Sequence, residues 1–151
     1  MQTLNLPAFP FRIREDGGKR EIFDVFRKRY VTLTPEEWVR QHFLSWLHLH
    51  KHYPLGLIAV EISLKYHQLQ KRADAIIYGK EGLPLMMIEC KAPSVRLTQD
   101  VFDQIARYNF NFGVKYLVVT NGLVHYCCRK EGEGNEWAFL EEVPDFESLA
   151  G

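Results

Sequence analysis

An α/β domain built on a mixed β-sheet is the fold class that the sequence predicts, and three observations lead to it. A helix start signal with an apolar stripe of helical spacing comes first. Three segments of strand character follow, and a second helical segment then precedes two more strands. The chain has 151 residues, which fits one domain. This order of elements predicts helices beside a sheet that has parallel and antiparallel pairs.

The first helix should begin at Pro35, because proline suits the first helical position. Thr34 can cap it, and Glu36 and Glu37 favour the positive end of the helix. Apolar residues then mark one face at helical spacing, and His50 falls in line with them: Val39, Phe43, Trp46 and Leu47. Pro54 ends the helix.

Six strands and a second helix should follow. The expected strands cover residues 57–66, 73–78, 85–91, 116–120 and 123–129, with an edge strand at 137–140. The first alternates, with Ile58, Val60, Ile62 and Leu64 on one side, and the third is apolar enough to be buried on both faces. The second helix should run over residues 98–112, and Asn121-Gly122 predicts a two-residue hairpin turn.

Charge is distributed unevenly, although the formal net charge is zero. Residues 1–31 should form an irregular arm with short strands, a turn at Asp16-Gly17-Gly18, and four apolar side chains that need burial: Ile22, Phe23, Val25 and Phe26. The arm is rich in Lys and Arg, whereas residues 131–151 form an acidic tail after the core at 35–130. A local basic patch and a solvated charged face are both consistent with this pattern.

Composition excludes several classes of protein. No apolar run reaches the ~18 residues of a membrane-spanning helix, so no membrane partner is expected. Cys90, Cys127 and Cys128 form no disulfide framework, which indicates a reducing cytoplasm. The chain has no glycine-rich phosphate loop, so we expect no nucleotide cofactor.

Two carboxylates are expected to face each other in an apolar setting. If the turn before the third strand centres on Glu81-Gly82, antiparallel pairing places Tyr78 opposite Leu85, Ile76 opposite Met87, and Asp74 opposite Glu89. Opposed side chains have Cβ atoms only ~5 Å apart, so the two carboxylates repel each other unless one is protonated or a cation lies between them. Mg²⁺ prefers such oxygen ligands and keeps waters that a phosphate can replace.

Lys91 lies two residues after Glu89 and should project from the same face of the strand. A lysine beside a metal-bound water can orient it and stabilise the charge that develops on phosphate oxygens. The same register places Arg72 opposite Lys91. Simple ion pairs among these residues are the alternative interpretation, because a Glu-x-Lys sequence also arises by chance.

The sequence resembles the PD-(D/E)xK nuclease superfamily, and within it the N-terminal nuclease domain of type I restriction enzyme R subunits. Three segments carry this resemblance over residues 35–129: Arg72-Ala73-Asp74, Ile88-Glu89-Cys90-Lys91-Ala92-Pro93 and Gln104-Ile105-Ala106-Arg107-Tyr108. It implies a restriction-endonuclease-like αβββαβ core and a hydrolase with catalytic Asp74, Glu89 and Lys91. It also implies Mg²⁺ or Mn²⁺ held by Asp74, Glu89 and the backbone carbonyl of Cys90, with Glu37 as a further candidate ligand.

The resemblance also bears on partners. Gln104 and Tyr108 match a Gln-x-x-x-Tyr element, and because they are four residues apart they share a helix face that can contact DNA. Alanine stands at position 73, where the motif has proline. The 151 residues hold none of the ATP-driven motor of a full R subunit, so motor or specificity subunits of a restriction system are candidate partners. The oligomeric state is open.

Two functions therefore follow from the sequence. The first is a Mg²⁺-dependent endonuclease that hydrolyses DNA phosphodiester bonds. The second is a non-catalytic module that uses the same fold to bind nucleic acid or another protein. The intact Asp, Glu and Lys set favours the first, whereas the zero net charge favours the second or an enzyme that depends on a partner.

Overall fold

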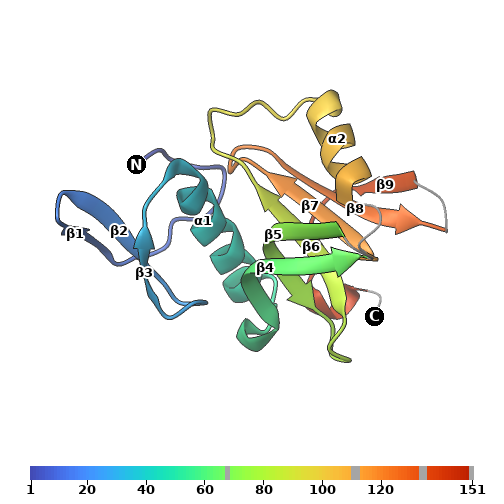
Figure 1. Ribbon diagram of the computed structural model, residues 1–151, viewed down its shortest axis with the longest axis horizontal. Helices are drawn as coiled ribbons and strands as arrows, with labels where there is room; N and C mark the ends of the chain where they lie inside the picture. Colours follow the sequence, from blue (N-terminus) through green and yellow to red (C-terminus); the bar gives the residue numbers. More distant parts are fainter. Residues whose placement is uncertain (67–68, 110–112, 133–135, 150–151) are drawn as a thin grey trace.

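A mixed six-stranded sheet forms the centre of the computed structural model, which describes residues 1–66, 69–109, 113–132 and 136–149 (Figure 1). Its strand order is β4-β5-β6-β7-β8-β9, and only β6 and β7 pair in parallel. The strands are β4 (Ile58–Tyr66), β5 (Leu69–Tyr78), β6 (Pro84–Cys90), β7 (Tyr116–Thr120), β8 (His125–Glu131) and β9 (Glu136–Leu140). The predicted α/β fold with a mixed sheet is confirmed.

Two α-helices lie against opposite faces of this sheet. Helix α1 (Pro35–His50) packs on one face through Val39, Phe43 and Leu47, in a cluster that we call the α1-side cluster. Helix α2 (Gln99–Asn109) covers the other face through Phe102 and Ala106, in the α2-side cluster. Strand β6 lies between β5 and β7 and contributes buried residues to both clusters, as its continuous apolar sequence predicts.

A threonine side chain caps the beginning of each α-helix. The Oγ1 atom of Thr34 accepts a hydrogen bond of 3.0 Å from the backbone N–H of Glu37, so the predicted cap of α1 is confirmed. The Oγ1 atom of Thr98 accepts in the same way from Val101 at 3.3 Å, before α2. Helix α2 extends to Asn109, and the rest of its predicted range, residues 110–112, lies outside the described residues.

Two turns differ from their predicted geometry. Tyr78 pairs with Pro84 rather than Leu85, because a bulge interrupts the register between β5 and β6. The β7–β8 connection has four residues instead of two: the Oδ1 atom of Asn121 accepts bonds of 2.9 Å from the N–H groups of Leu123 and Val124. This side-chain acceptor makes the longer turn favourable, and Gly122 occupies it with φ of 85°.

The alternation of β4 reverses at Glu61, contrary to the prediction. Val60 packs in the α1-side cluster, whereas Ile62 packs in the α2-side cluster. Their partners on β5 behave alike, since Ala75 lies in the first cluster and Ala73 in the second. Glu61 has φ of 55°, in the left-handed region, which turns the strand over at this point. The side chain of Leu64 lies outside the described residues.

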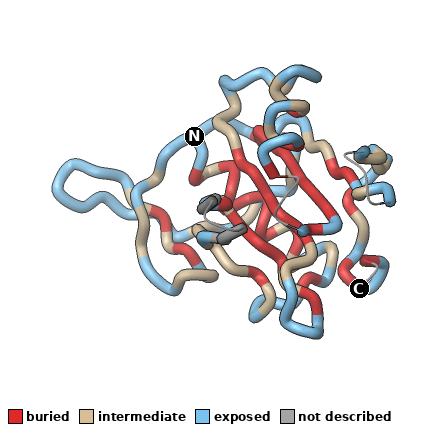
Figure 2. Tube along the Cα trace, turned by 45° about the vertical axis from the view of Figure 1, so that its right-hand side comes forward, coloured by how far each residue is buried: buried red, intermediate tan, exposed pale blue. Residues whose placement is uncertain are grey.

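The N-terminal arm forms a separate three-stranded sheet, β1 (Ile13–Asp16), β2 (Lys19–Asp24) and β3 (Arg29–Thr32), on the outer side of α1 (Figure 1). The predicted turn at Asp16-Gly17-Gly18 joins β1 and β2. Residues 12–20 are all exposed, whereas buried residues concentrate in the large sheet and α1 (Figure 2). Ile22 is buried as predicted, but Val25 is 46% exposed because it lies in the β2–β3 turn.

The C-terminal residues return to the core. Short 3₁₀ helices lie at Leu55–Leu57 (η1) and Phe146–Ser148 (η3), and Val143, Phe146 and Leu149 join the α1-side cluster. No helix among the described residues is both long and apolar enough to cross a lipid bilayer.

Candidate active site

Asp74 lies where strands β5 and β6 separate. The pairing of these strands includes Ile76 with Met87, as predicted, and ends at Ala75 and Ile88, one step before Asp74 and Glu89. Beyond that point the Oδ2 atom of Asp74 accepts a hydrogen bond of 2.6 Å from the backbone N–H of Cys90. The carboxylate of Asp74 is thus held directly against the Glu89-Cys90-Lys91 segment, through a side-chain bond instead of a ladder pair.

Glu89 and Lys91 share one side of β6. Met87 belongs to the α2-side cluster and Cys90 to the α1-side cluster, so alternation places Glu89 on the α2 side, where it is 7% exposed. The backbone N–H of Lys91 donates to the carbonyl of Thr120 at 2.8 Å, which continues the contact with β7 one residue past the strand. This bond keeps Lys91 extended, on the same side as Glu89.

The thiol of Cys90 is fully enclosed and shows how acidic its surroundings are. Burial raises the pKa of this thiol well above its ordinary value, and the neighbouring carboxylates of Asp74 and Glu89 raise it further, against the opposing effect of Arg40. The carboxylates of Asp74 and Glu89 therefore both lie near the buried end of β6. Such a place favours a bound cation.

Two arginine side chains donate hydrogen bonds to the carboxylate of Glu37. Its oxygens accept bonds from Arg27 at 2.7 Å, from Arg40 at 2.5 and 3.1 Å, and from Gln41 at 2.9 Å. Burial raises the pKa of Glu37, but the bonds from Arg40 and then from Gln41 and Arg27 outweigh it, so the pKa is lowered. Glu37 is a charged anchor for two guanidinium groups, and its predicted role as a metal ligand remains a prediction.

Glu61 joins this arginine network to the strand that carries Asp74. Its carboxylate lies 3.4 Å from Arg27, 3.3 Å from Arg40 and 2.8 Å from Arg72. Arg40 also donates to the backbone carbonyl of Asp74 at 3.3 Å. The side chain of Arg72 therefore points to Glu61 on β4. The predicted position of Arg72 opposite Lys91 is wrong, because the strand reverses its faces at Glu61.

A cavity of about 660 Å³ opens beside Asp74. Its walls come from the arm (Arg29, Tyr30, Thr32), from the start of α1 (Glu36, Glu37), and from the strand ends at Asp74, Cys90 and Ala92. The side chains of Glu89 and Lys91 do not line it, since they lie on the other side of β6. Of the three predicted catalytic residues, Asp74 therefore shares this cavity with the arm.

Gln104 and Tyr108 lie on the exposed face of α2, opposite its buried residues. Tyr108 is 57% exposed, so its ring is accessible to a ligand. The predicted common face for these two residues is confirmed, and its contact with DNA remains a prediction.

Comparison with known proteins gives a match to one family model and to a solved structure. Residues 35–144 match the model of the type I restriction enzyme R protein N terminus. The chain belongs to this family. Among solved structures, the domain is similar to one described as a fragment of an HsdR subunit of a type I restriction enzyme from Vibrio vulnificus, with a TM-score of 0.54 and 20% identity. The match covers 78% of this chain and 24% of that one, so the R-subunit N-terminal domain described here spans about a quarter of that structure's chain. A search of curated proteins finds no significant match.

Sequence reasoning did not identify the roles of Arg27, Arg40 and Glu61. The ion pair of Arg40 with Glu37 could have been predicted, since Arg40 follows Glu37 by three residues on the same helix and can reach it. The roles of Arg27 and Glu61 could not, because these residues come from the arm and from β4 and meet α1 only after folding.

Proposed function

We propose that this R-subunit N-terminal domain is a Mg²⁺-dependent endonuclease that hydrolyses DNA phosphodiester bonds. The hydrogen bond from Cys90 N–H to Asp74 Oδ2 is the observation that carries the proposal. It holds one carboxylate against a strand end that bears a second carboxylate and a lysine. Membership of the restriction enzyme family supports nucleic acid as the substrate class.

Asp74, Glu89 and the carbonyl of Cys90 would hold the ion. All three donors are oxygens, and Mg²⁺ is commonly bound by one or two carboxylates while waters and substrate phosphates complete its shell. Burial is the main cause of the raised pKa of the Cys90 thiol, and the carboxylates of Asp74 and Glu89 add to it, so both carboxylates lie near the end of β6. When bound, the ion would polarise a phosphate oxygen and make a coordinated water more acidic.

Lys91 would act on the reacting groups. Its backbone bond to Thr120 restricts its position, and it shares the α2 side of β6 with Glu89. From there an ammonium group can orient the attacking water and stabilise negative charge on the phosphate oxygens as they develop it. Arg27, Arg40 and Arg72, by contrast, are all engaged by carboxylates.

Nicking of supercoiled plasmid with Mg²⁺ or Mn²⁺ tests this proposal. Lys91→Ala should keep metal and DNA binding but lose about a hundredfold or more in cleavage rate, the usual effect of removing a preorganised charge. Lys91→Arg should not restore cleavage, since a planar guanidinium cannot reproduce the compact ammonium. Lys80→Ala, an exposed lysine in the turn before β6, is the matched control and should cut like wild type.

Three outcomes decide between the candidate functions. Loss of cleavage in Lys91→Ala alone supports the endonuclease. Equal cleavage by Lys91→Ala and wild type refutes the assigned mechanism. A wild-type protein that binds DNA but never cuts it, alone or with the motor and specificity subunits of a restriction system, supports the non-catalytic module. The subunits belong in this assay because the domain corresponds to only 24% of the similar HsdR chain.

A further inference from the structure

The three-stranded arm differs from the rest of the domain in charge. Residues 12–30 contain seven Lys and Arg residues and four Asp and Glu residues, an excess of three positive charges in a chain whose formal net charge is zero. The match to the restriction enzyme family begins at residue 35 and so leaves the arm out. The family assignment therefore supplies no role for it.

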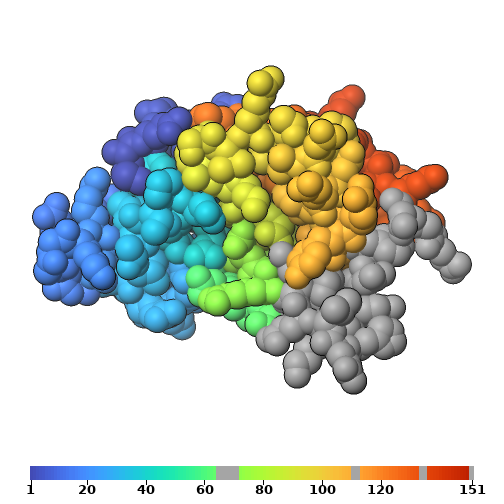
Figure 3. Space-filling model, turned by 45° about the horizontal axis from the view of Figure 1, so that its top comes forward, coloured from blue at the N-terminus to red at the C-terminus, as the bar shows by residue number. Residues whose placement is uncertain are grey.

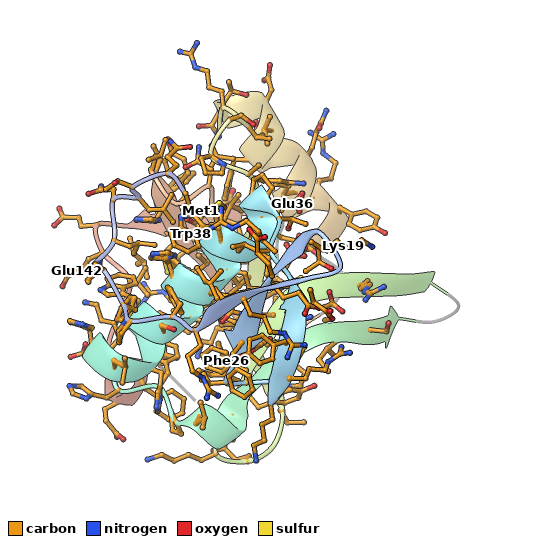
Figure 4. The ribbon with its side chains drawn as sticks, turned by 90° about the vertical axis from the view of Figure 1, so that its left-hand side faces the viewer. Met1, Lys19, Phe26, Glu36, Trp38 and Glu142 are labelled. Carbon is orange, nitrogen blue, oxygen red and sulfur yellow. The ribbon has the colours of Figure 1, made fainter. Side chains whose placement is uncertain are left out.

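Four cations of the arm are free to meet an external partner. They are Lys19, Arg20, Lys28 and Arg29, all exposed. Within the described residues none of them forms an ion pair, whereas Arg14 pairs with Glu21 and Arg12 lies over the ring of Phe23. Figure 4, viewed from the arm's side, shows Lys19 at the tip of the β1–β2 hairpin.

The arm is held firmly beside the candidate active site. Arg27 in the β2–β3 turn bonds Asp24, Glu37 and Glu61, and so ties the arm to α1 and β4. Arg29 and Asp74 both line the same cavity. A binding surface on the arm therefore stands at a constant position relative to Asp74, and a rigid surface loses little entropy when a ligand binds.

The arm, the segment after β6 and α2 follow one another across a single face of the molecule (Figure 3). In Figure 3 the arm (blue) lies at one side, the segment after β6 (yellow) lies in the middle, and α2 (orange) lies beyond it. A nucleic acid strand that crosses this face would meet the arm's cations, the segment that contains Lys91, and the exposed face of α2 in turn.

We propose that the arm is a phosphate clamp for DNA, in which Lys19, Arg20, Lys28 and Arg29 bind the backbone beside the scissile bond. The choice of DNA rests on the proposed function. Contacts of this kind neutralise phosphates without reading bases, so they position the strand and are independent of its sequence. The cavity itself also holds Glu21, Glu36 and Glu61, so the phosphates lie on the exposed cations at its rim and not within it.

A double variant, Lys28→Gly/Arg29→Ala, tests the clamp in the full chain. Lys28 has φ of 56°, and glycine adopts this conformation without steric cost, so the charge is removed while the turn is kept. The control is Lys80→Ala/Lys115→Ala, which removes two exposed lysines at the other end of β6: Lys80 precedes the strand, and Lys115 bonds Leu85 at its start. Far-ultraviolet circular dichroism and the melting temperature establish that both variants fold.

Binding of fluorescent duplex DNA, measured by anisotropy in EDTA, separates binding from cleavage. Wild-type affinity should fall linearly with salt on a double-logarithmic plot, and the arm variant should reduce the slope by about two, since each lost phosphate contact accounts for ~0.9. Its affinity should fall about tenfold at about 100 mM salt, equally for unrelated sequences, while the control stays within about twofold of wild type.

An unchanged slope in the arm variant would overturn the clamp, and so would an equal loss in the control or a wild type that binds no DNA. The first two results are distinct from failure of the proposed endonuclease, whereas a wild type that binds no DNA would contradict both proposals. If wild type cuts DNA and Lys91→Ala does not, yet the arm variant binds like wild type, the enzyme assignment holds and the clamp is wrong. If the arm governs binding in a protein that never cuts, the clamp holds and the enzyme assignment is wrong.

Discussion

Removing the charge of Glu37 should destabilise the domain more than removing the charge of its neighbour Glu36. In Glu37→Gln the shape of the side chain is kept, but two nearly buried guanidinium groups, on Arg27 and Arg40, lose a charged acceptor. Breaking a buried ion pair from one side costs about 3–5 kcal/mol, because the remaining charge stays desolvated. Arg27 keeps Asp24, and both arginines keep Glu61, so the lower end of about 3 kcal/mol is expected.

The matched control for this change is Glu36→Gln. Glu36 is the preceding residue, exposed in the same first turn of α1, so both variants lose one charge near the positive helix end. Its substitution should cost less than about 1 kcal/mol. For a domain of this length about 3 kcal/mol corresponds to a fall of about 6–12 °C in melting temperature. Differential scanning calorimetry measures it, and equal melting temperatures for the two variants would refute the anchoring role of Glu37.

The pH dependence of stability offers a second measurement on the same pair. The pKa of Glu37 is lowered in the folded state, so its stabilising effect is fully present above the ordinary glutamate pKa of about 4.3. That stability is lost as the pH falls through the lowered pKa, where the folded carboxylate takes up a proton. Glu37→Gln should therefore lose less stability than Glu36→Gln between about pH 5 and pH 3.

Three further predictions concern the metal, DNA and a tight turn. Mg²⁺ or Mn²⁺ should raise the wild-type melting temperature in a concentration-dependent way. Asp74→Asn, whose amide oxygen can still accept the Cys90 bond, should abolish this effect, and a wild-type melting temperature that does not change with either ion would exclude the metal site. Replacing Gln104 and Tyr108 by alanine should weaken DNA binding by about 1–3 kcal/mol in anisotropy titrations, and unchanged affinity would remove α2 from the interface. Gly122→Ala should cost about 2–4 kcal/mol in urea denaturation, because a Cβ there lies 2.8 Å from a leucine methyl at φ of 85°; Gly18→Ala, with φ of 81° but open space, should cost less.

Local sequence signals predicted those parts of the fold that depend on neighbouring residues. The cap at Thr34 and the helix after it depend on residues within one turn, and the continuous apolar run of β6 reflects burial on two faces. These signals, with the spacing of the family's motifs, placed Asp74 and Glu89 on adjacent strands at the correct end of the sheet.

The unpredicted parts arise from contacts between distant residues or from single backbone torsions. The reversal at Glu61 requires a positive φ that glutamate seldom adopts, and no neighbouring residue indicates it. The bulge beside Leu85 changes one pairing without changing the hydrophobic pattern. Backbone strain such as the positive φ of Glu61 concentrates at functional sites. Glu61 lies beside Asp74, and so does the end of the β5–β6 ladder at Ala75 and Ile88.

The reversal at Glu61 and the arginine network together explain how Asp74 acquires its position. A regular β5–β6 ladder would continue past Ala75 and leave the backbone N–H groups at the end of β6 paired with main-chain carbonyls. Because β4 and β5 change faces at this point, the ladder stops, and the carboxylate of Asp74 takes the N–H of Cys90 instead. Arg40 stabilises the departure by donating to the carbonyl of Asp74 while it holds Glu37 and Glu61. The ion network is thus the support that keeps an acidic side chain at the end of β6, and Arg27 extends that support to the arm.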